Sequence, residues 1–397
     1  MSIGSENPVL EALGRPLRLG VIGGGPGSFI GPIHRSAAQL DGRLRVVAGV
    51  LSSDPAKCVS HGLGLGLDAA RAYTSVAAML AAERLRPDGI EVVAVMTPND
   101  RHFDDCRQAL AAGLHVVCDK PLANTVAQAR ELLGLAATSQ RLLCVTHNYS
   151  GYPMVRQARA MVQAGAIGAV RMIHAEYFQA GMATAVERGP LSSKLVWKLD
   201  PACGGPSLVL GDIGTHAHHL AAYVGVSPVV AVAADVGTLT PGRTFDDYAA
   251  LLWRFANGAR GTCCVTQAAA GTENNLTIRV YGESGSLEWQ HKAPNYLQHA
   301  PLGEAVRTLG RGDAYLLPAA LRASRLSRGH PEGFRESFAN LYADVAEVIA
   351  ARISGRAVDP LALDFPDARA GLQGALFVDA ALRSSQAGGA WTDLEPE

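Results

Sequence analysis

Asp212 and His216 are the two residues whose types and spacing most directly suggest acid–base chemistry. They are four residues apart in the stretch 207–223, whose apolar pattern predicts one amphipathic helix, so both side chains would share a face of that helix. A carboxylate beside an imidazole can accept and release a proton near neutral pH. The same pattern is also typical of a capped helix with an ordinary surface histidine, and the rest of the chain has to separate the two interpretations.

Length and composition set the broad class. The chain has 397 residues, enough for two domains, and its formal net charge of −1 argues against nucleic acid or an anionic membrane surface as a general partner. No apolar run reaches the roughly 18 residues of a membrane span, and the first residues lack the basic start of a signal peptide, so a cytoplasmic protein is expected. The seven cysteines show no C-x-x-C spacing, and we predict neither a disulfide framework nor a metal site.

A glycine-rich turn follows the first predicted strand. The apolar run 17–22 precedes this turn, and a helix from about 33 to 40 and a second apolar run, 44–51, follow it. This order predicts a βαβ unit whose turn binds the diphosphate of a dinucleotide at a helix N-terminus. The pattern G-x-G-x-x-G is met at its first two positions, with a serine at the third. The predicted turn contacts are Gly23, Gly25, Pro26, Gly27 and Ser28.

The end of the second predicted strand bears on the choice of cofactor. Ser52 stands where NAD-binding folds commonly carry an acidic ribose ligand, and Ser53 follows it. A serine hydroxyl can hydrogen-bond either a ribose hydroxyl or a 2′-phosphate. Asp54 lies two residues further on and is alternatively the cap of the next helix. NAD is therefore the expected cofactor, with NADP as the alternative.

Strands and helices alternate up to about residue 150, which predicts a doubly wound parallel sheet, a Rossmann fold, over residues 1–150. In such sheets the ligand lies beyond the carboxyl ends of the strands. Polar residues follow several of these predicted ends. The further candidate cofactor contacts are Thr97, Pro98, Asn99, His102, Lys120, Pro121 and Asn148.

After residue 150 the pattern changes to short strand-like runs separated by tight turns. These runs predict a second domain, 151–397, of the α+β class, with a large open and mostly antiparallel sheet flanked by helices. The segment 292–331 is predicted to be irregular, and helices are expected at 334–353 and 366–384. The helix at 207–223 must pack on one face of the sheet, so we expect a homodimer or homotetramer that covers the other face.

The motifs of this chain, taken in order, resemble the Gfo/Idh/MocA family (glucose-fructose oxidoreductase, inositol dehydrogenase and rhizopine catabolism). The resemblance extends from about residue 17 to about residue 383. It implies a Rossmann domain followed by an open-sheet domain that is often paired across subunits. It also implies an NAD(P)-dependent dehydrogenase acting on the CH–OH groups of sugars and polyols (EC 1.1.1.-). The motifs are the glycine turn, Thr97-Pro98-Asn99, Asp119-Lys120-Pro121 and Gly211-Asp212-Ile213-Gly214-Thr215-His216.

The resemblance assigns roles residue by residue. Lys120 matches the lysine of the family's Glu-Lys-Pro motif, which contacts substrate and nicotinamide, although Asp119 stands here in place of the glutamate. Pro121 matches the proline of that motif. Asp212 and His216 match the Asp and His of the family helix, where the histidine is the usual acid/base.

Two further matches concern the cofactor and the substrate. Asn99 matches an asparagine that lies near the cofactor, and Trp197-Lys198 resembles a Trp-Arg pair that often lines the sugar pocket. Many members carry an arginine after the tyrosine at the position of Tyr149, where this chain has Ser150.

Hydride transfer from a carbinol carbon requires a base for the hydroxyl proton and a donor for the forming carbonyl oxygen. His216 can be the base, Lys120 can be the donor, and Asp212 can orient the imidazole or relay protons. His34, in the first helix, is either a neighbour of the diphosphate or structural. We therefore predict oxidation or reduction at a secondary carbon of a sugar, glycoside or cyclitol; the alternative is a non-catalytic dinucleotide sensor that kept the fold. The predicted substrate contacts are Lys120, Tyr149, Tyr177, Trp197, Lys198, Asp212, His216 and His330.

Overall fold

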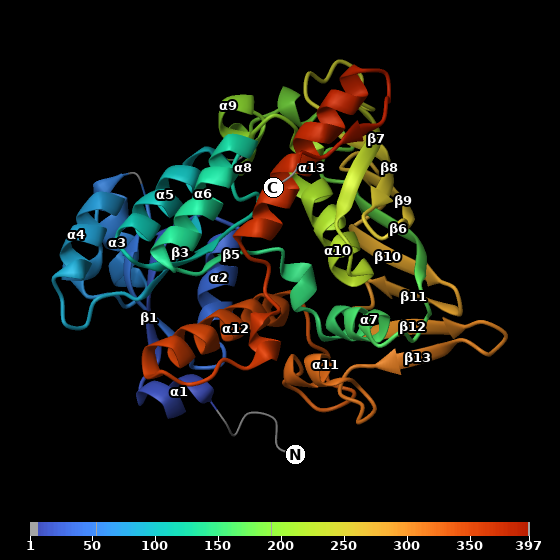
Figure 1. Ribbon diagram of the computed structural model, residues 1–397. Helices are drawn as coiled ribbons and strands as arrows, with labels where there is room; N and C mark the ends of the chain where they lie inside the picture. The colour runs from blue at the N-terminus through green and yellow to red at the C-terminus, as the bar shows by residue number, and fades with distance from the viewer. Residues whose placement is uncertain (1–6, 53, 192, 396–397) are drawn as a thin grey trace. The chain divides into compact units, whose positions relative to one another are not determined.

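The computed structural model describes residues 7–52, 54–191 and 193–395, which divide into two compact units (Figure 1). The first unit contains the residues up to Asn148 together with Phe334–Leu372, and the second contains Tyr149–Gly333 and the residues from Gln373 onward. The division falls beside the predicted boundary at residue 150, and the first unit also takes in a segment from the last quarter of the chain. The assignment of the two units as functional domains stays a prediction.

The first unit is built on a five-stranded parallel sheet with the order β2-β1-β3-β4-β5, which confirms the predicted doubly wound fold. Helices cover both faces of such a sheet, so its strands read as continuous apolar runs rather than as alternating ones. Val92–Met96, for example, is buried at every position. The strands are β1 (Leu17–Gly23), β2 (Leu44–Val50), β3 (Val92–Met96), β4 (His115–Cys118) and β5 (Leu143–Val145).

Three helices of the first unit begin at polar caps that can be recognised in the sequence. Asp54, Ser75 and Thr125 each accept hydrogen bonds from backbone N–H groups of the first turn that follows them. Helix α12 packs against α1 and α2, while α5 packs against α6 (Figure 1). The helices of the unit are α1 (Pro8–Leu13), α2 (Ile30–Gln39), α3 (Pro55–Gly64), α4 (Val76–Arg84), α5 (Asn99–Ala111), α6 (Val126–Ser139) and α12 (Phe334–Ser354).

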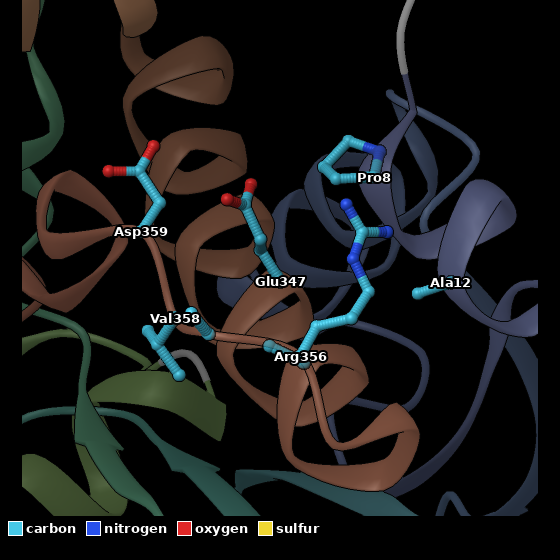
Figure 2. Close-up of a pocket in the computed structure, with 8 residues that line it drawn as sticks. Pro8, Ala12, Glu347, Arg356, Val358 and Asp359 are labelled. Carbon is cyan, nitrogen blue, oxygen red and sulfur yellow. The ribbon is translucent and has the colours of Figure 1, made fainter.

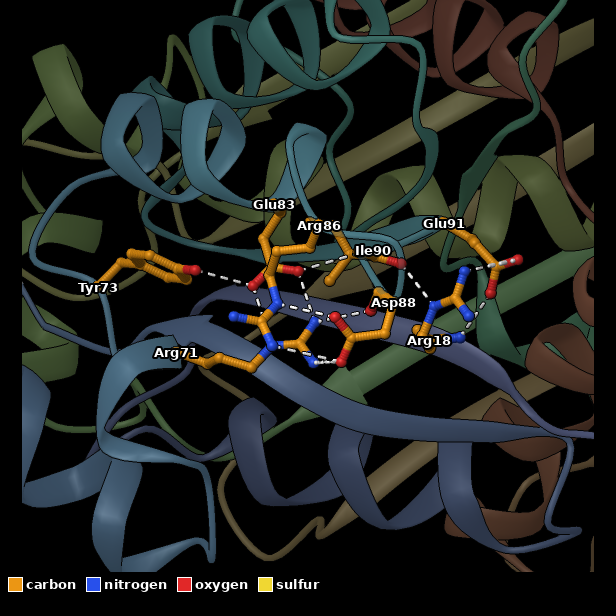
Figure 3. A network of polar contacts seen from close by, with 9 residues as sticks. Arg18, Arg71, Tyr73, Glu83, Arg86, Asp88, Ile90 and Glu91 are labelled. Carbon is orange, nitrogen blue, oxygen red and sulfur yellow. Dashed lines mark hydrogen bonds and ion pairs between the residues drawn. The ribbon is translucent and has the colours of Figure 1, made fainter.

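A buried charge network stabilises the segment between α3 and β3 (Figure 3). The Arg71 guanidinium donates to Glu83 (Nε to Oε1, 3.0 Å) and to Asp88 (Nη1 to Oδ2, 3.1 Å), and the Tyr73 hydroxyl donates to Glu83 (2.9 Å). Burial and the neighbouring Glu83 carboxylate raise the pKa of Tyr73 to about 12. Because the buried charges are paired and hydrogen-bonded to one another, we interpret this network as structural.

The second unit is built on a nine-stranded sheet with the order β13-β12-β11-β10-β6-β9-β8-β7-β14. Only the β6–β9 pair is parallel among the described strand pairs of this sheet, so the predicted mostly antiparallel sheet is confirmed. The strands are β6 (Val170–Gln179), β7 (Val229–Gly237), β8 (Tyr248–Phe255), β9 (Arg260–Thr266), β10 (Asn274–Gly282), β11 (Gly285–Gln290), β12 (Tyr296–Pro301), β13 (Arg307–Gly310) and β14 (Thr392–Asp393).

The prediction of an irregular segment over 292–331 was wrong. Strands β12 and β13 form a hairpin in it, and β12 pairs with β11 in antiparallel register. Helix α11 (Pro318–Arg322) follows within the same segment. Polar residues and a proline in Tyr296–Pro301 obscure the apolar alternation that would have indicated a strand, and pairing with β11 decides the structure there.

Helices lie against one face of this sheet. Helix α10 (Thr215–Gly225) packs on β6 and β10, and α7 (Pro153–Gln163) packs on β11 and β12. The strands also present half-exposed side chains on the other face, where Met172 is 43% and Leu252 is 50% exposed. The remaining helices are α8 (Ser193–Lys198), α9 (Pro201–Gly204) and α13 (Ala368–Gln386). Within the described ranges, no helix combines the length and the apolar character that crossing a membrane requires.

Because α10 carries two buried histidines, we predict that the free energy of unfolding decreases in acid. Burial lowers the pKa of His218 and of His219 to about 3, against 6.5 for a free side chain. The unfolded chain therefore binds these protons first, so the free energy of unfolding falls as the pH drops from about 6.5 towards 3. Replacing His218, which stacks on Phe377 with ring centroids 4.5 Å apart, by leucine should reduce this slope by about 1.4 kcal/mol per pH unit.

Urea unfolding of wild type and of His218→Leu at several pH values between 4 and 6.5 measures the two slopes. The matched control is His330→Leu, because His330 is exposed. Equal slopes for His218→Leu and wild type would contradict the prediction, whatever the substitution does to stability at pH 7.

Candidate functional site

The register of the parallel sheet brings the predicted strand-end residues of the first unit to one edge. Gly23 at the end of β1 pairs with Met96 at the end of β3, and Cys118 at the end of β4 pairs with Val95 on β3 and Val145 on β5. The strand order reverses between β1 and β3, which is where doubly wound sheets bind their ligands. The glycine turn, Thr97, Lys120 and Asn148 all follow these ends.

The glycine turn needs glycine for two different reasons. Gly23, Gly24 and Gly27 have φ values of 78°, 68° and 77°, a region that side chains with a Cβ rarely adopt. At Gly25 the reason is space, because a Cβ there would lie 1.8 Å from the carbonyl oxygen of Leu51. A bare backbone beside the start of a helix fits the diphosphate of a dinucleotide.

A further glycine that the contact between turn and helix requires is Gly31, in the first turn of α2, and the sequence pattern did not indicate it. A Cβ on Gly31 would lie 2.1 Å from the carbonyl oxygen of Gly24, so glycine allows α2 to approach the turn. Ser28, predicted as the third position, instead accepts a hydrogen bond from the backbone N–H of Gly31 (3.1 Å), in the first turn of α2. The longer spacing explains why the pattern G-x-G-x-x-G did not find Gly31.

The end of β2 lies next to this turn. Its Ser52 hydroxyl accepts a hydrogen bond from the backbone N–H of Asp54 (3.1 Å), and the Asp54 carboxylate accepts from the N–H groups of Ala56 and Lys57. Asp54 therefore caps α3, the alternative that the sequence analysis left open. The predicted contact of Ser53 lies outside the described residues.

The segment that carries Lys120 is held by hydrogen bonds to Asp119. The Asp119 carboxylate accepts from the Thr146 hydroxyl and from the backbone N–H of Lys120, both at 2.9 Å. Burial opposes ionisation of Asp119, but the neighbouring His34 and Lys120 outweigh it and keep its pKa below the usual range. The Lys120–Pro121 peptide bond is cis.

The other predicted cofactor residues of this edge have varied surroundings. Thr97 donates from its hydroxyl to Asp105 (2.9 Å), and Asn99 is the first residue of α5, directly after Pro98. His102 is 1% exposed, and both of its ring nitrogens approach backbone carbonyls. Asn148 is buried and donates to Ser337 (3.2 Å). Cofactor contact by these residues stays a prediction.

In the second unit, the predicted helix 207–223 is interrupted. Leu210–Gly214 forms a π-helical turn, and the α-helix α10 begins only at Thr215. The Asp246 carboxylate accepts from the backbone N–H groups of Leu208 (3.0 Å) and Val209 (2.9 Å), which anchors the start of the turn. Single π-helical turns inside helices occur frequently at functional sites, and this one carries Asp212.

Two side chains hold the Asp212 carboxylate. Its Oδ2 accepts from Lys198 Nζ and from Gln267 Nε2, each at 2.7 Å. Gln267, at the end of β9, also donates to Gln179 (3.3 Å). Trp197 and Lys198 were predicted to line a sugar pocket. The Lys198 ammonium lies 5.9 Å from the centre of the Trp197 ring and forms an ion pair with Asp212. Substrate contact by Trp197 and by Lys198 stays a prediction.

Two tyrosine rings lie beside His216. Its ring meets Tyr149 edge-on with centroids 4.9 Å apart, and the Tyr149 and Tyr177 hydroxyls are 2.6 Å apart. The Tyr177 hydroxyl donates to Asn274 (2.8 Å). Burial, reinforced by the Asp212 carboxylate, raises the pKa of both tyrosines, so they are neutral hydroxyls at physiological pH.

The structure adds three residues to this cluster that the sequence analysis did not select: Gln267, Asn274 and His291. His291 lies with its ring 5.3 Å from that of Tyr149, centroid to centroid. Gln267 directly follows β9, and Asn274 is the first residue of β10, so a carboxamide at a strand end was the one available signal. His330 is exposed, with its ring nitrogen 3.2 Å from the Ser327 hydroxyl, and its predicted substrate contact also stays a prediction.

One pocket in the first unit does not contain any predicted site residue. Figure 2 shows this pocket, of about 270 Å³, lined by residues of α1 and α12 and by the chain after α12. Its Glu347 is paired with Arg43 (3.2 Å). Residues 7–52, 54–191 and 193–395 contain no cluster of histidine, cysteine or carboxylate side chains able to hold a metal.

Models of known protein families match both units of the chain. Residues 17–147 match the model of an oxidoreductase family with an NAD-binding Rossmann fold, and residues 155–288 match the GFO/IDH/MocA C-terminal domain. The uncharacterized oxidoreductase YfiI of Bacillus subtilis is 35% identical over 391 residues, covering 96% of this chain and 98% of that protein.

Two further relatives have names or bound ligands that indicate a substrate. An inositol dehydrogenase homolog of Azotobacter vinelandii, solved with NAD+, is 37% identical with a TM-score of 0.90 and covers 96% of this chain and 97% of that one. The same homolog has been solved with NADH and myo-inositol. Levoglucosan dehydrogenase of Pseudarthrobacter phenanthrenivorans is 30% identical over 59% of this chain and 63% of its own length. The chain belongs to the Gfo/Idh/MocA family and is an NAD-dependent oxidoreductase.

Proposed function

We propose that this protein oxidises a secondary hydroxyl of a sugar, glycoside or cyclitol, with NAD as the acceptor. The buried cluster around Asp212 and His216 is the observation that carries the proposal. It joins one carboxylate and one imidazole to neutral hydroxyl and carboxamide groups, which both donate and accept hydrogen bonds as a polyol requires. Gln267 Oε1 is buried without a hydrogen-bond partner among the described residues, and a substrate hydroxyl would satisfy it.

The names of the relatives agree with this class of substrate. One is a homolog of inositol dehydrogenase solved with myo-inositol, and another is named for levoglucosan. The bound nicotinamide supplies the hydride acceptor. We assign the hydroxyl proton to His216 and the donor to the oxygen that becomes the carbonyl to Lys120. Asp212, which accepts hydrogen bonds from Lys198 and Gln267, is the third catalytic residue that we propose.

The cofactor contacts that we propose follow the edge of the parallel sheet. The turn from Gly23 to Ser28 receives the diphosphate, and Ser52 receives a ribose hydroxyl. The contacts at the other strand ends are Thr97, Pro98, Asn99, Lys120, Pro121 and Asn148. The sequence also predicted His102 as a contact, but both of its ring nitrogens lie at backbone carbonyls, and a different role is proposed for it below. The substrate contacts that we propose beyond Lys120, Asp212 and His216 are Tyr149, Tyr177, Trp197, Lys198 and His330.

Fluorescence titration with NADH and NADPH, followed by a panel of polyols, sugars and glycosides, tests the function. We expect tighter binding of NADH and formation of NADH from NAD+ with at least one cyclitol or glycoside. Absence of binding to either nucleotide would overturn the proposal. Binding of NADH without turnover of any panel member would favour the alternative, a dinucleotide sensor.

We also propose that the exposed face of the nine-stranded sheet joins two copies of the chain. Leu252→Glu would place a charge on that face, where Leu252 is half exposed, and burial of that charge in an interface is costly. We expect the molar mass from light scattering to fall from that of an oligomer to that of a monomer. Leu85→Glu is the control, because Leu85 is 81% exposed in the first unit. A wild type that is already monomeric would contradict the proposal.

A further inference from the structure

Two buried histidines approach the segment Asp119-Lys120-Pro121, one on each side of Lys120. His102 contacts the carbonyl of Pro121, and His34 faces the carboxylate of Asp119. We propose that His102 and His34 are positioning residues that fix Lys120 at the sheet edge. The proposal rests on the catalytic role of Lys120 proposed above, and it concerns contacts within the first unit alone.

His102 connects two strand ends through its ring. Its Nδ1 lies 2.7 Å from the carbonyl oxygen of Pro121, and its Nε2 lies 2.9 Å from that of Thr97. Both partners are carbonyl oxygens, which only accept, so a ring nitrogen of His102 that carries a proton donates to the carbonyl beside it. The ring is 1% exposed, so water does not replace either partner. His102 therefore joins the residue after β3 to the residue after Lys120.

His34 faces Asp119, the residue before Lys120. Its Nδ1 lies 2.7 Å from the Tyr342 hydroxyl, and its ring meets Phe338 edge-on with centroids 5.1 Å apart. Burial raises the pKa of Tyr342, so this hydroxyl keeps its proton and can donate to Nδ1. The ring proton then lies on Nε2, which is 3.9 Å from Asp119 Oδ1 and has no hydrogen-bond partner in the described part of the chain. Proximity of His34 to the diphosphate, which the sequence analysis considered, stays a prediction.

The two contacts reach Lys120 through its immediate neighbours. Asp119 accepts the backbone N–H of Lys120 (2.9 Å), and Pro121 follows Lys120 directly. Loss of either histidine loosens one end of this short segment, and the ammonium of Lys120 moves with the backbone. A displacement of about 1 Å at a catalytic group can cost about 100-fold in rate, so we expect kcat to fall by about 10- to 100-fold in His102→Phe, with a smaller fall in His34→Phe.

The first test observes Lys120 directly and needs no substrate. Reductive methylation with ¹³C-formaldehyde labels the side chains of Lys57, Lys120, Lys194, Lys198 and Lys292, and the loss of one signal in Lys120→Arg identifies that of Lys120. We expect the Lys120 signal to move in His102→Phe and in His34→Phe and the other four to stay in place. His102→Gln, which keeps N–H donors, should move it less.

The matched control is His115→Phe. His115 is the first residue of β4, the strand that ends just before Asp119 and Lys120, and it is 5% exposed. Its Nδ1 accepts from the backbone N–H of Leu142 (2.9 Å). We expect this substitution to affect stability and to leave the Lys120 signal in place. An unmoved Lys120 signal in folded His102→Phe, or an equal movement in His115→Phe, would overturn the proposal.

The second test separates positioning from cofactor contact. Positioning lowers kcat and changes the dissociation constant of NADH by less than about 3-fold, whereas loss of a cofactor contact weakens NADH binding by as much as it lowers turnover. The latter result would overturn the positioning role of His102. Absence of turnover in the wild type would refute the proposed function alone, and the NMR signal of Lys120 would still decide the inference.

Discussion

Lys120→Met is expected to lower kcat by about 10²- to 10³-fold, the cost of removing one donor to a developing oxyanion. Methionine keeps the length and the apolar stem of lysine and removes only the ammonium, so the effect reports the charge. The dissociation constant of NADH should change by only a few fold, because the diphosphate is held by the glycine turn. Steady-state rates with the substrate found in the panel, together with NADH titration, measure both quantities.

The control for this prediction is Lys292→Met. Lys292 is exposed in the second unit, so its loss should leave kcat and NADH affinity unchanged. An unchanged kcat in Lys120→Met would contradict the role of Lys120 and with it the proposed chemistry. A 10²-fold loss of NADH affinity with kcat unchanged would instead make Lys120 a cofactor ligand only.

The elements of the fold that local pattern determines were predicted from the sequence. Buried parallel strands such as Val92–Met96 are continuous apolar runs, and capping residues such as Asp54 and Thr125 mark where helices begin. The return of α12 to the first unit could not be predicted in this way, because it depends on packing against α1 and α2, more than 290 residues earlier. Strand β12 could not be predicted for a similar reason, because its structure depends on pairing with β11.

The site was predicted to the extent that each residue belongs to a short motif. Lys120, Asp212 and His216 stand in such motifs, and so does the glycine turn up to Ser28. Gly31 and Gln267 do not. The importance of Gly31 appears only when α2 is folded against Gly24, and that of Gln267 only when the end of β9 meets the π-helical turn at Asp212. Neither contact follows from a sequence motif, because no known spacing links Gly31 to Gly24 or Gln267 to Asp212.

His216→Gln is expected to lower kcat by about 10²- to 10⁴-fold, the usual contribution of a general base. Glutamine fills similar space and can hydrogen-bond, but it cannot take a proton. Its neighbours Tyr149 and Tyr177 are neutral, since burial raises their pKa values, and so they cannot replace the imidazole as a base near pH 7. Single-turnover measurement of NADH formation isolates this chemical step from product release.

The same helix supplies the control for His216→Gln. His219 lies three residues further on, stacks on Tyr223 with ring centroids 5.8 Å apart, and is as well buried as His216. His219→Gln should therefore lower the thermal stability of α10 to a similar degree while NADH formation stays within a few fold of wild type. If both variants lose turnover equally, the effect belongs to the packing of the helix, and the proton must be taken by another group. If only His216→Gln loses it, the lost group is the base, because the two variants differ in the neighbours of the imidazole rather than in its burial.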